Sequence, residues 1–465
     1  MFKKKINKLF YNSPIWIQNV CISCYGYYRK NRRFGGVFSE YVAVFLQNEK
    51  KTAEAWKDYQ TQELRKLLVH AFETVPYYKE LYTKHGFTIE DFKNFELSQL
   101  PKLPYLEKEA LRKFGENKLL SLHKKPGGFY SSSGSTGTPT KIYFSKYFHQ
   151  IWSAAYEVRI RKWAGIDKTM NRGMIGGRKI GEDSSAKAPF YRFNAAEKQT
   201  YFSAYHISLD TVDDYVAGFV KNKVEYLVGY AMSIYYLADF IVQKKIEVPK
   251  QKAVITSSEK LTSEMRTVIE KAFQCKVYDS YSGVEACGLI SENSFGELIF
   301  SQDTGIMEVV DAHGNEVLTG ENGEVIATGL LNFDQPLIRY RIGDCVTMAK
   351  EQKSKSNVQM PIVKEISGRT EDTITTLDGR KMVRFHSIFT DIEHLKQGQI
   401  IQNSLSEFEL NCVVHPSFSK ESENEMRTRL KKQIGEQVQI KFNYLDTIPL
   451  MANGKFRAVI SKIEQ

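Results

Sequence analysis

Long apolar runs are absent from this sequence, and cysteine is scarce. Polar residues such as Asn19 and Asp239 interrupt the most apolar segments, so none approaches the roughly 20 residues of a membrane-spanning helix. The chain has six scattered cysteines. Cys21 and Cys24 form one CxxC pair, but the sequence has no second CxxC pair that could complete a metal site with it. We therefore expect free thiols in a reducing compartment, and neither a disulfide framework nor a zinc site.

Acidic residues are missing from the N-terminal arm, residues 1–40, until Glu40. Most of the net charge of +11 lies in this arm and the rest of the chain is close to balanced, which disfavours nucleic-acid binding. The arm mixes its cations with aromatic residues, as suits peripheral contact with an anionic membrane. The alternative is an arm that packs its aromatic rings on its own domain and leaves its lysines in solvent. We expect a cytoplasmic protein, and contact with the inner face of the membrane stays open. The cations are Lys3, Lys4, Lys5, Lys8, Arg29, Lys30, Arg32 and Arg33.

Strand and helix patterns alternate in the middle of the 465-residue chain, which is long enough for more than one domain. Such alternation predicts a parallel sheet with covered faces. After Glu297, short alternating segments joined by glycine turns predict antiparallel strands, and beyond Gly368 a small β/α unit follows. The expected strands are 224–229, 253–256, 276–278, 398–414 and 438–444, and the expected helices are 232–243, 262–273, 387–396 and 421–435.

These patterns predict a multidomain α/β protein. We expect a large N-terminal body over residues 41–366, with parallel sheets and a β-rich subdomain. A small, mobile α+β C-terminal domain would occupy residues 367–465, which is a usual domain size.

The segment Phe129–Lys141 carries the clearest chemical signal in the chain. Its serine and threonine hydroxyls, two glycines and one proline stand between apolar, strand-like residues. Glycine allows a tight turn and close approach to a ligand, and bared N–H groups with hydroxyls form a concave nest for phosphate oxygens. The segment lacks the Gly-Lys-Ser/Thr ending of a Walker A loop. A Ser/Gly turn without a ligand is the alternative interpretation.

Five further clusters follow in a definite order. Taken alone, each is equally well explained as core, turn or surface: Tyr281 as a core ring, for example, or Lys455 as one of many surface lysines. The clusters are Ser257–Glu259, Tyr281–Glu285, Arg339–Asp344, Ser367–Asp372 and Asn453–Arg457.

Their order and spacing resemble the adenylate-forming superfamily, which includes acyl-CoA synthetases, peptide-synthetase adenylation domains and luciferases. Within it the chain resembles the phenylacetate–CoA ligase branch, especially the capsular-polysaccharide-associated CapK-like proteins. Leu68–Ala71 followed by Val75–Tyr78, the Leu100–Pro104 segment and the Thr138-Pro-Thr form of the loop before Lys141 support this branch. The resemblance covers nearly the whole chain.

The resemblance implies ATP and Mg²⁺ as cofactors, with CoA as an acceptor, and assigns a role to each motif. The loop would embrace the β- and γ-phosphates, an adenine slot would lie beside a carboxylate that holds Mg²⁺, and a C-terminal lysine would bridge the attacking oxygen and the α-phosphate. The loop residues are Ser132, Ser133, Gly134, Ser135, Thr136, Gly137, Thr138 and Lys141. The remaining assignments are Ser258, Glu259 and Tyr281 for adenine, Glu285 for Mg²⁺, Asp344 and Arg369 for ribose, Asp372 for the hinge, and Lys455 and Glu285 for catalysis.

The acyl pocket is assigned less directly. Tyr205, His206 and Gly283 are its candidates, although His206 can equally be a structural histidine beside an aromatic ring. The expected substrate is a small-molecule carboxylate, whose identity the sequence does not reveal.

Three positions depart from the family pattern. Val284 replaces a hydroxyl residue, Ile342 replaces a threonine, and Gly379 comes one residue later than the usual glycine of the acceptor tunnel. An amine or hydroxyl acceptor, such as one linked to a sugar, is therefore an alternative to CoA.

We predict an AMP-forming ligase that activates a carboxylate as an acyl-adenylate and then transfers the acyl group, in capsular or surface polysaccharide biosynthesis. A scaffold or binding protein that keeps the fold without turnover is the alternative, with Val284 as its main support.

Overall fold

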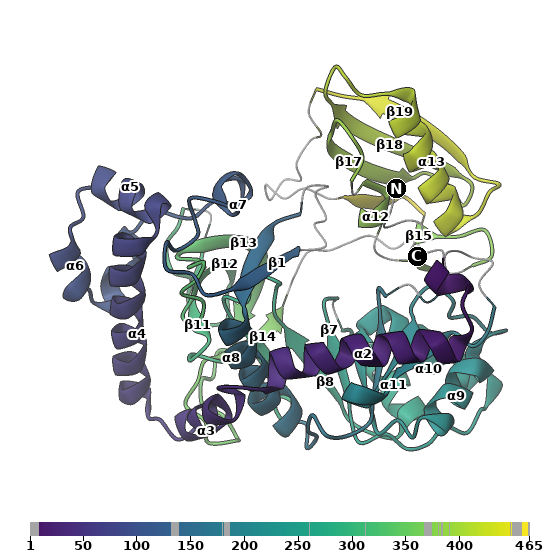
Figure 1. Ribbon diagram of the computed structural model, residues 1–465, viewed down its shortest axis with the longest axis horizontal. Coiled ribbons are helices and arrows are strands. Elements are labelled where there is room, and N and C mark those ends of the chain that lie inside the picture. The colour runs from purple at the N-terminus through teal and green to yellow at the C-terminus, as the bar shows by residue number, and fades with distance from the viewer. Residues whose placement is uncertain are drawn as a thin grey trace. The chain divides into compact units, whose positions relative to one another are not determined.

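The computed structural model describes residues 9–131, 139–178, 180, 187–259, 261–311, 313–366, 374–379, 381–382, 385–389, 391–446, 448 and 458–463 (Figure 1). The chain divides into two compact units. The large unit comprises residues 1–130 and 142–368, and the small unit comprises residues 131–141 and 369–465. The domain limits drawn from the sequence, and the lid role of residues 367–465, stay predictions.

The large unit begins with a series of helices. Thr52 caps α4, because its side chain accepts a hydrogen bond from the N–H of Ala55, and Pro76 starts α5 at a position where a missing N–H costs nothing. The helical pattern around Leu64–Phe72 thus stops at Val75-Pro76, where α4 ends and α5 begins. The helices are α2 (Ile15–Phe34), α3 (Phe38–Asn48), α4 (Ala53–Thr74), α5 (Pro76–Lys84), α6 (Ile89–Lys93) and α7 (Lys108–Phe114).

Two short strands flank the predicted phosphate loop. β1 (Gly127–Ser131) and β2 (Lys141–Ser145) pair in a two-stranded sheet, and α8 (Lys146–Tyr156) follows directly, continued by η2 (Glu157–Lys162). The Ser145 side chain caps α8 by accepting from the N–H of Phe148. The strand–loop–strand reading of the flanking residues is therefore confirmed.

A twelve-stranded mixed sheet dominates the described part of the large unit, in the order β11-β12-β13-β14-β10-β9-β8-β7-β6-β3-β5-β4. Strands β5, β3, β6, β7 and β8 run parallel, with helices between them, as the alternating pattern predicts. The strands of this part are β3 (Arg172–Gly176), β4 (Tyr191–Asn194), β5 (Gln199–Ser203), β6 (Tyr226–Tyr230), β7 (Val254–Ser257) and β8 (Val277–Tyr281). The intervening helices are η3 (Ala195–Glu197), α9 (Val212–Lys221), α10 (Ala231–Lys244) and α11 (Ser263–Phe273).

The antiparallel strands continue the same sheet. Tyr281 of β8 pairs with Ile290 of β9 in antiparallel register, so the parallel strands and the β-rich segment are parts of one sheet. The fold class is confirmed, with this one difference in how its parts are joined. The antiparallel strands are β9 (Ile290–Glu292), β10 (Leu298–Phe300), β11 (Gly305–Val310), β12 (Asn322–Gly329), β13 (Tyr340–Met348) and β14 (Ile362–Ile366).

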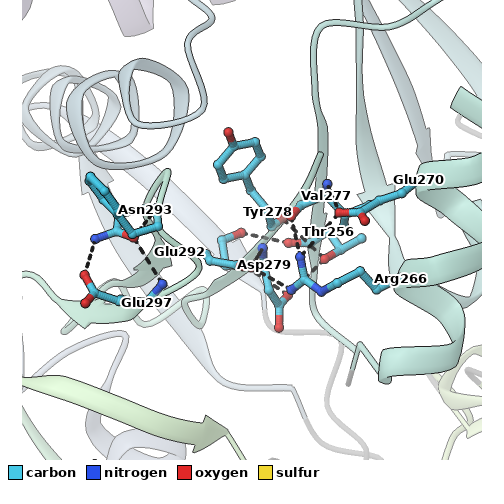
Figure 2. Close-up of polar contacts among 11 residues, drawn as sticks. Thr256, Arg266, Glu270, Val277, Tyr278, Asp279, Glu292, Asn293 and Glu297 are labelled. Atoms are coloured by element: carbon cyan, nitrogen blue, oxygen red, sulfur yellow. Dashed lines mark hydrogen bonds and ion pairs between the residues drawn. The ribbon is translucent and has the colours of Figure 1, made fainter. Parts of the chain in front are cut away.

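A polar network holds the seam where β8 meets β9 (Figure 2). Arg266 of α11 donates through Nη2 to Glu292 Oε2 at 2.8 Å, and the same oxygen accepts from the N–H of Asp279 at 2.8 Å. Thr256 of β7 donates to Asp279 Oδ1 at 3.0 Å. The seam therefore ties α11 and three neighbouring strands together through side chains as well as backbone.

The small unit has its own core and a four-stranded sheet in the order β19-β18-β17-β20. Phe408, Leu410, Met426 and Leu430 are among its buried residues. Its elements are β15 (Ile374–Thr375), β16 (Lys381–Met382), α12 (His386–Phe389), β17 (Leu395–Gln402), β18 (Glu407–Val414), α13 (Lys420–Ile434), β19 (Gln439–Tyr444) and β20 (Val459–Ser461).

The helix expected over residues 387–396 is wrong in its length. α12 ends at Phe389, and β17 begins at Leu395. Asp391 and His394 have positive φ values of 57° and 63°, and a helix cannot continue through left-handed residues.

The α2 part of the arm contradicts the interpretation in which the aromatic rings pack on their own domain, and contact with a membrane stays a prediction. α2 is fixed to the body by polar contacts: Gln18 Oε1 accepts from Arg192 Nε at 2.7 Å, and Arg32 Nη2 donates to the carbonyl of Phe144 at 2.7 Å. Several aromatic side chains nevertheless stay exposed, including Trp16 and Tyr27. Among the described helices, α2 included, none is long and apolar enough to cross a membrane.

Candidate active site

Several candidate residues lie at the carboxyl ends of the parallel strands of the large sheet. Tyr205 and His206 follow β5, Ser258 and Glu259 follow β7, and Tyr281 ends β8. Because all these strands run parallel, their carboxyl ends lie on the same side. In open α/β sheets this edge is the usual place for ligands.

Tyr281 and Asp344 are joined directly. The Tyr281 hydroxyl donates a hydrogen bond to Asp344 Oδ2 at 2.7 Å, which connects the end of β8 with β13. Burial raises the pKa of Tyr281 well above its usual range, and the Asp344 carboxylate raises it further. The phenol therefore stays protonated and acts as a donor. Two residues predicted to bind the nucleoside are thus brought together.

A small cavity of about 10 Å³ lies beside this pair, and its lining includes Tyr281, Gly283, Glu285 and Ile342. Glu285 is only 9% exposed. A Cβ atom on Gly283 would stand 2.3 Å from Glu285 Oε2, so a glycine is needed for this carboxylate position. The Tyr281–Glu285 turn therefore presents one largely buried carboxylate next to the phenol.

Glu285 fits a magnesium site of a particular kind. No cluster of three or more His, Cys, Asp or Glu side chains suited to a metal occurs among the residues that the structure describes. Mg²⁺, however, is commonly held by one or two carboxylates together with substrate phosphates. A single carboxylate such as Glu285 matches that arrangement.

The segment after β7 lies next to Tyr281. Ser257 pairs with Ser280 in the parallel register of β7 and β8, so Ser258 follows at the level of Tyr281. Ser258 has a φ of 71°, a left-handed conformation that is unusual for serine and is often found at functional sites. This places Ser258 and Glu259 where the adenine slot is predicted.

His206 and Tyr205 are held by local contacts. His206 Nδ1 lies 2.7 Å from Ser203 Oγ, and its ring stacks on Phe190 with centroids 4.7 Å apart. The Tyr205 hydroxyl donates to the carbonyl of Gly177 at 3.2 Å. These contacts are those of a structural histidine at the active-site edge, and a role for either residue in the acyl pocket stays a prediction.

Sequence reasoning missed three residues at this edge. The Tyr156 hydroxyl of α8 lies 3.0 Å from Ser282 Oγ and so supports the turn after Tyr281. Tyr230 ends β6, and its hydroxyl would lie 2.9 Å from a Cβ on Gly177, which follows β3. The position of Tyr230 after a predicted strand was a usable signal, whereas nothing in the sequence pointed to Tyr156 or Gly177.

Several predicted residues stand apart from this description. Ser132–Thr138, Arg369, Asp372 and Lys455 lie outside the described residues. Lys141 begins β2 and is exposed. The roles assigned to all of them stay predictions.

Comparisons with known proteins agree with the resemblance and the fold. Residues 374–462 match the family described as the CapK C-terminal domain. Over 471 residues the chain is 26% identical to Protein CapK of Staphylococcus aureus, with 99% of this chain and 100% of that protein covered. It is also 24% identical to the phenylacetate–coenzyme A ligase of Escherichia coli strain K12, over 68% of this chain and 71% of the ligase. The chain is a CapK-like protein related to the phenylacetate–CoA ligases.

Solved structures place this CapK-like protein in the same fold as adenylate-forming acyl-CoA ligases. The structure of 2-hydroxyisobutyryl-CoA ligase with 2-HIB-AMP and CoA in the thioesterification state matches with a TM-score of 0.58 at 18% identity, covering 89% of this chain and 91% of that one. An open conformation of the same ligase matches with a TM-score of 0.52 at 17% identity, over 87% and 91% of the two chains. The expected fold is therefore confirmed.

Proposed function

We propose that this CapK-like protein is an ATP-dependent, AMP-forming ligase that activates a carboxylate as an acyl-adenylate and transfers the acyl group to a second substrate. The hydrogen bond between Tyr281 and Asp344, next to Glu285 at the carboxyl edge of the sheet, carries the proposal. Its relatives among the phenylacetate–coenzyme A ligases and the shared fold support it.

Different residues of the site would bind different parts of ATP. The Tyr281 ring would lie against the base, with Ser258 and Glu259 at the other side of the slot. Asp344 would accept hydrogen bonds from the ribose hydroxyls, since a diol needs an acceptor and a carboxylate supplies two acceptor oxygens. Arg369 would assist at the ribose.

The chemical difficulty is that a carboxylate must approach a triphosphate of the same charge. Mg²⁺, held by Glu285 when bound, would supply charge neutralisation at the phosphates. Lys455 would place an ammonium group at the attacking oxygen and the α-phosphate, and Ser132–Thr138 with Lys141 would hold the outer phosphates. The hinge at Asp372 would bring Lys455 to and from the site.

The acceptor is either CoA or an amine or hydroxyl group. The 2-hydroxyisobutyryl-CoA ligase was solved with both an acyl-AMP and CoA, which supports CoA. Gly379 has a φ of 79° in the turn between β15 and β16, so this glycine makes a tight turn, which supports the turn that the resemblance assigns to the acceptor tunnel. The position of Gly379, one residue later than usual, keeps a sugar-linked acceptor as the alternative. A place in capsular or surface polysaccharide biosynthesis rests on the CapK resemblance alone.

ATP–pyrophosphate exchange tests the proposal. We expect exchange to depend on one class of acid in a panel of aryl, fatty, amino and sugar acids, and to be abolished by Asp344→Ala. Product analysis with CoA or an amino sugar would then identify the acceptor. Absence of exchange across the panel, with ATP still bound, would instead support the non-catalytic scaffold.

We also propose that the outer face of α2 contacts an anionic membrane. Trp16, Val20, Tyr25, Tyr27 and Tyr28 are 67%, 53%, 53%, 64% and 58% exposed, so the helix presents aromatic side chains to solvent. Tryptophan and tyrosine favour the membrane–water interface. The sequence adds charge complementarity, because Lys3, Lys4, Lys5 and Lys8 precede this helix without an acidic residue.

Vesicle co-sedimentation tests this contact. The full chain should bind phosphatidylglycerol vesicles and not phosphatidylcholine vesicles, and the double substitution Trp16→Ser with Tyr27→Ser should weaken binding several-fold. Leu318→Ser, at a 73% exposed leucine outside the arm, serves as the matched control. If the full chain ignores anionic vesicles, or if the control is affected equally, the membrane proposal is wrong.

A further inference from the structure

A second cavity, of about 240 Å³, lies at the amino ends of the parallel strands, whereas the candidate active site lies at their carboxyl ends. Arg172 is the first residue of β3, Tyr226 is the first of β6, and Lys198 directly precedes β5, so the cavity is at the amino ends of these strands. Five-residue strands rising about 3.3 Å per residue separate the two edges by roughly 16 Å. Its lining comprises Lys30, Phe34, Lys168, Thr169, Arg172, Ala196, Glu197, Lys198 and Tyr226.

Positive charge exceeds negative charge around this cavity, which we call the basic pocket. Arg161 is paired with Glu157 at 2.9 Å, and Arg33 is paired with Glu197. The guanidinium of Arg172 instead donates to the neutral Gln199 side chain and hydrogen-bonds with Tyr226. Among the described residues, Arg172 forms no ion pair with a carboxylate. The pairs thus leave a surplus of cations.

Lys168 is positioned by aromatic rings. Its Nζ lies 5.6 Å from the centroid of Phe34 and 5.5 Å from that of Phe38, and no ion pair of Lys168 occurs in the described part of the chain. Lys30 from α2 and Lys198 next to β5 add two further ammonium groups to the lining. Three separate segments therefore bring lysines to one cavity.

Two of the guanidinium groups each keep one unsatisfied donor, and the positive charges repel one another. The Nε atoms of Arg33 and Arg172 are buried without a hydrogen-bond partner, and buried donors are normally satisfied. Burial, together with the charges of Arg172, Arg29 and Arg161, lowers the pKa of Arg33 to about 9. A folded protein tolerates such repulsion better when an anion binds among the cations.

We propose that the basic pocket binds the phosphoryl group of a phosphorylated ligand. The guanidinium of Arg172 and the ammonium groups of Lys30, Lys168 and Lys198 match a doubly charged oxyanion with several acceptor oxygens. The cavity is larger than one phosphate group and has Phe34 and Tyr226 in its wall, so it has room for a sugar or another organic part. The site is separate from the ATP site of the proposed ligase.

Isothermal titration of the full chain with inorganic phosphate and with a hexose phosphate, at constant ionic strength, tests the proposal. Lys168→Met and Arg172→Met should each weaken phosphate binding by about 10- to 100-fold, since a charge-assisted hydrogen bond contributes roughly 1.5–3 kcal/mol. The matched control is Lys162→Met, which removes an exposed lysine at the end of η2 that does not line the pocket.

The outcomes separate this site from the proposed enzyme. Tighter binding of the hexose phosphate would identify a small metabolite. Binding to phosphatidylglycerol vesicles that is lost in Lys168→Met would identify a lipid headgroup, and either result supports the pocket. Wild-type phosphate affinity in Lys168→Met, or no phosphate binding by the unmodified chain, would overturn it. The phosphate affinity of Arg172→Met is interpreted only if this variant shows a cooperative melting curve. If it does not, the affinity of Lys168→Met alone decides the test. ATP–pyrophosphate exchange should persist in Lys168→Met.

Discussion

At the scale of single residues, the proposed nucleotide site depends on a pair that lies 63 positions apart in the chain, Tyr281 and Asp344. The phenol is buried and keeps its proton, so its hydrogen bond orients the Asp344 carboxylate. The same β8 strand also carries Tyr278, whose ring is 8% exposed. These two tyrosines allow a matched comparison.

Tyr281→Phe should raise the KM for ATP in pyrophosphate exchange by several-fold, because the aromatic ring remains while the hydrogen bond to Asp344 is lost. Tyr278→Phe on the same strand is the control, since no hydrogen bond of its hydroxyl occurs in the described structure. An unchanged KM for ATP in Tyr281→Phe would remove the orienting role of the phenol.

Gly283→Ala should lower the exchange rate by about 10²–10³, the usual cost of losing an electrostatic partner, because the added Cβ displaces the Glu285 carboxylate. Gly128→Ala is the control, since a Cβ there has no heavy atom within 4 Å. Wild-type rates in Gly283→Ala would show that the position of this carboxylate is not required.

At the scale of elements, the seam between β8 and β9 has a titratable group at its centre. Burial, opposed by the hydrogen bond from the Thr256 hydroxyl and assisted by the charge of Glu292, raises the pKa of Asp279 to about 7. In the unfolded chain the carboxyl titrates near its ordinary value of 3.8. Between these values the unfolded state binds fewer protons, so this group makes stability fall as pH rises from about 4 to about 7.

Asp279→Asn should remove that part of the pH dependence, because the amide keeps an acceptor for Thr256 and does not ionise. Apparent Tm values between about pH 4.5 and pH 8 measure it, with Asp210→Asn as an exposed control. The difference in Tm between the variant and the wild type should grow in favour of the variant as pH rises. A constant difference across this range would show that Asp279 is not protonated in the fold.

Some of these elements could be predicted from the local sequence pattern, and others could not. The strands beside the hydroxyl-rich loop followed from the apolar residues that flank it. The prediction of a helix over residues 387–396 was wrong because Asp391 and His394 adopt left-handed backbone conformations that interrupt it. Neither aspartate nor histidine by itself predicts such a break.

At the scale of the whole molecule, the proposed reaction needs both units. Lys455→Ala should abolish adenylation while ATP binding is largely kept, because the predicted base contacts and Asp344 belong to the large unit and the lysine belongs to the small one. Exchange kinetics and ATP titration measure the two effects, with Lys441→Ala in β19 as the control. Adenylation kinetics equal to wild type in Lys455→Ala would refute the main catalytic assignment.

The sequence by itself determined the fold class, the relation to CapK-like proteins and most candidate residues, because these depend on residue types at short spacing. Tertiary structure alone decided that the parallel and antiparallel strands form one sheet and that Tyr281 bonds to Asp344. It alone decided that Lys30, Lys168 and Arg172 meet in one pocket. The physical reason is that contacts between distant residues depend on strand register and packing, which no local pattern specifies.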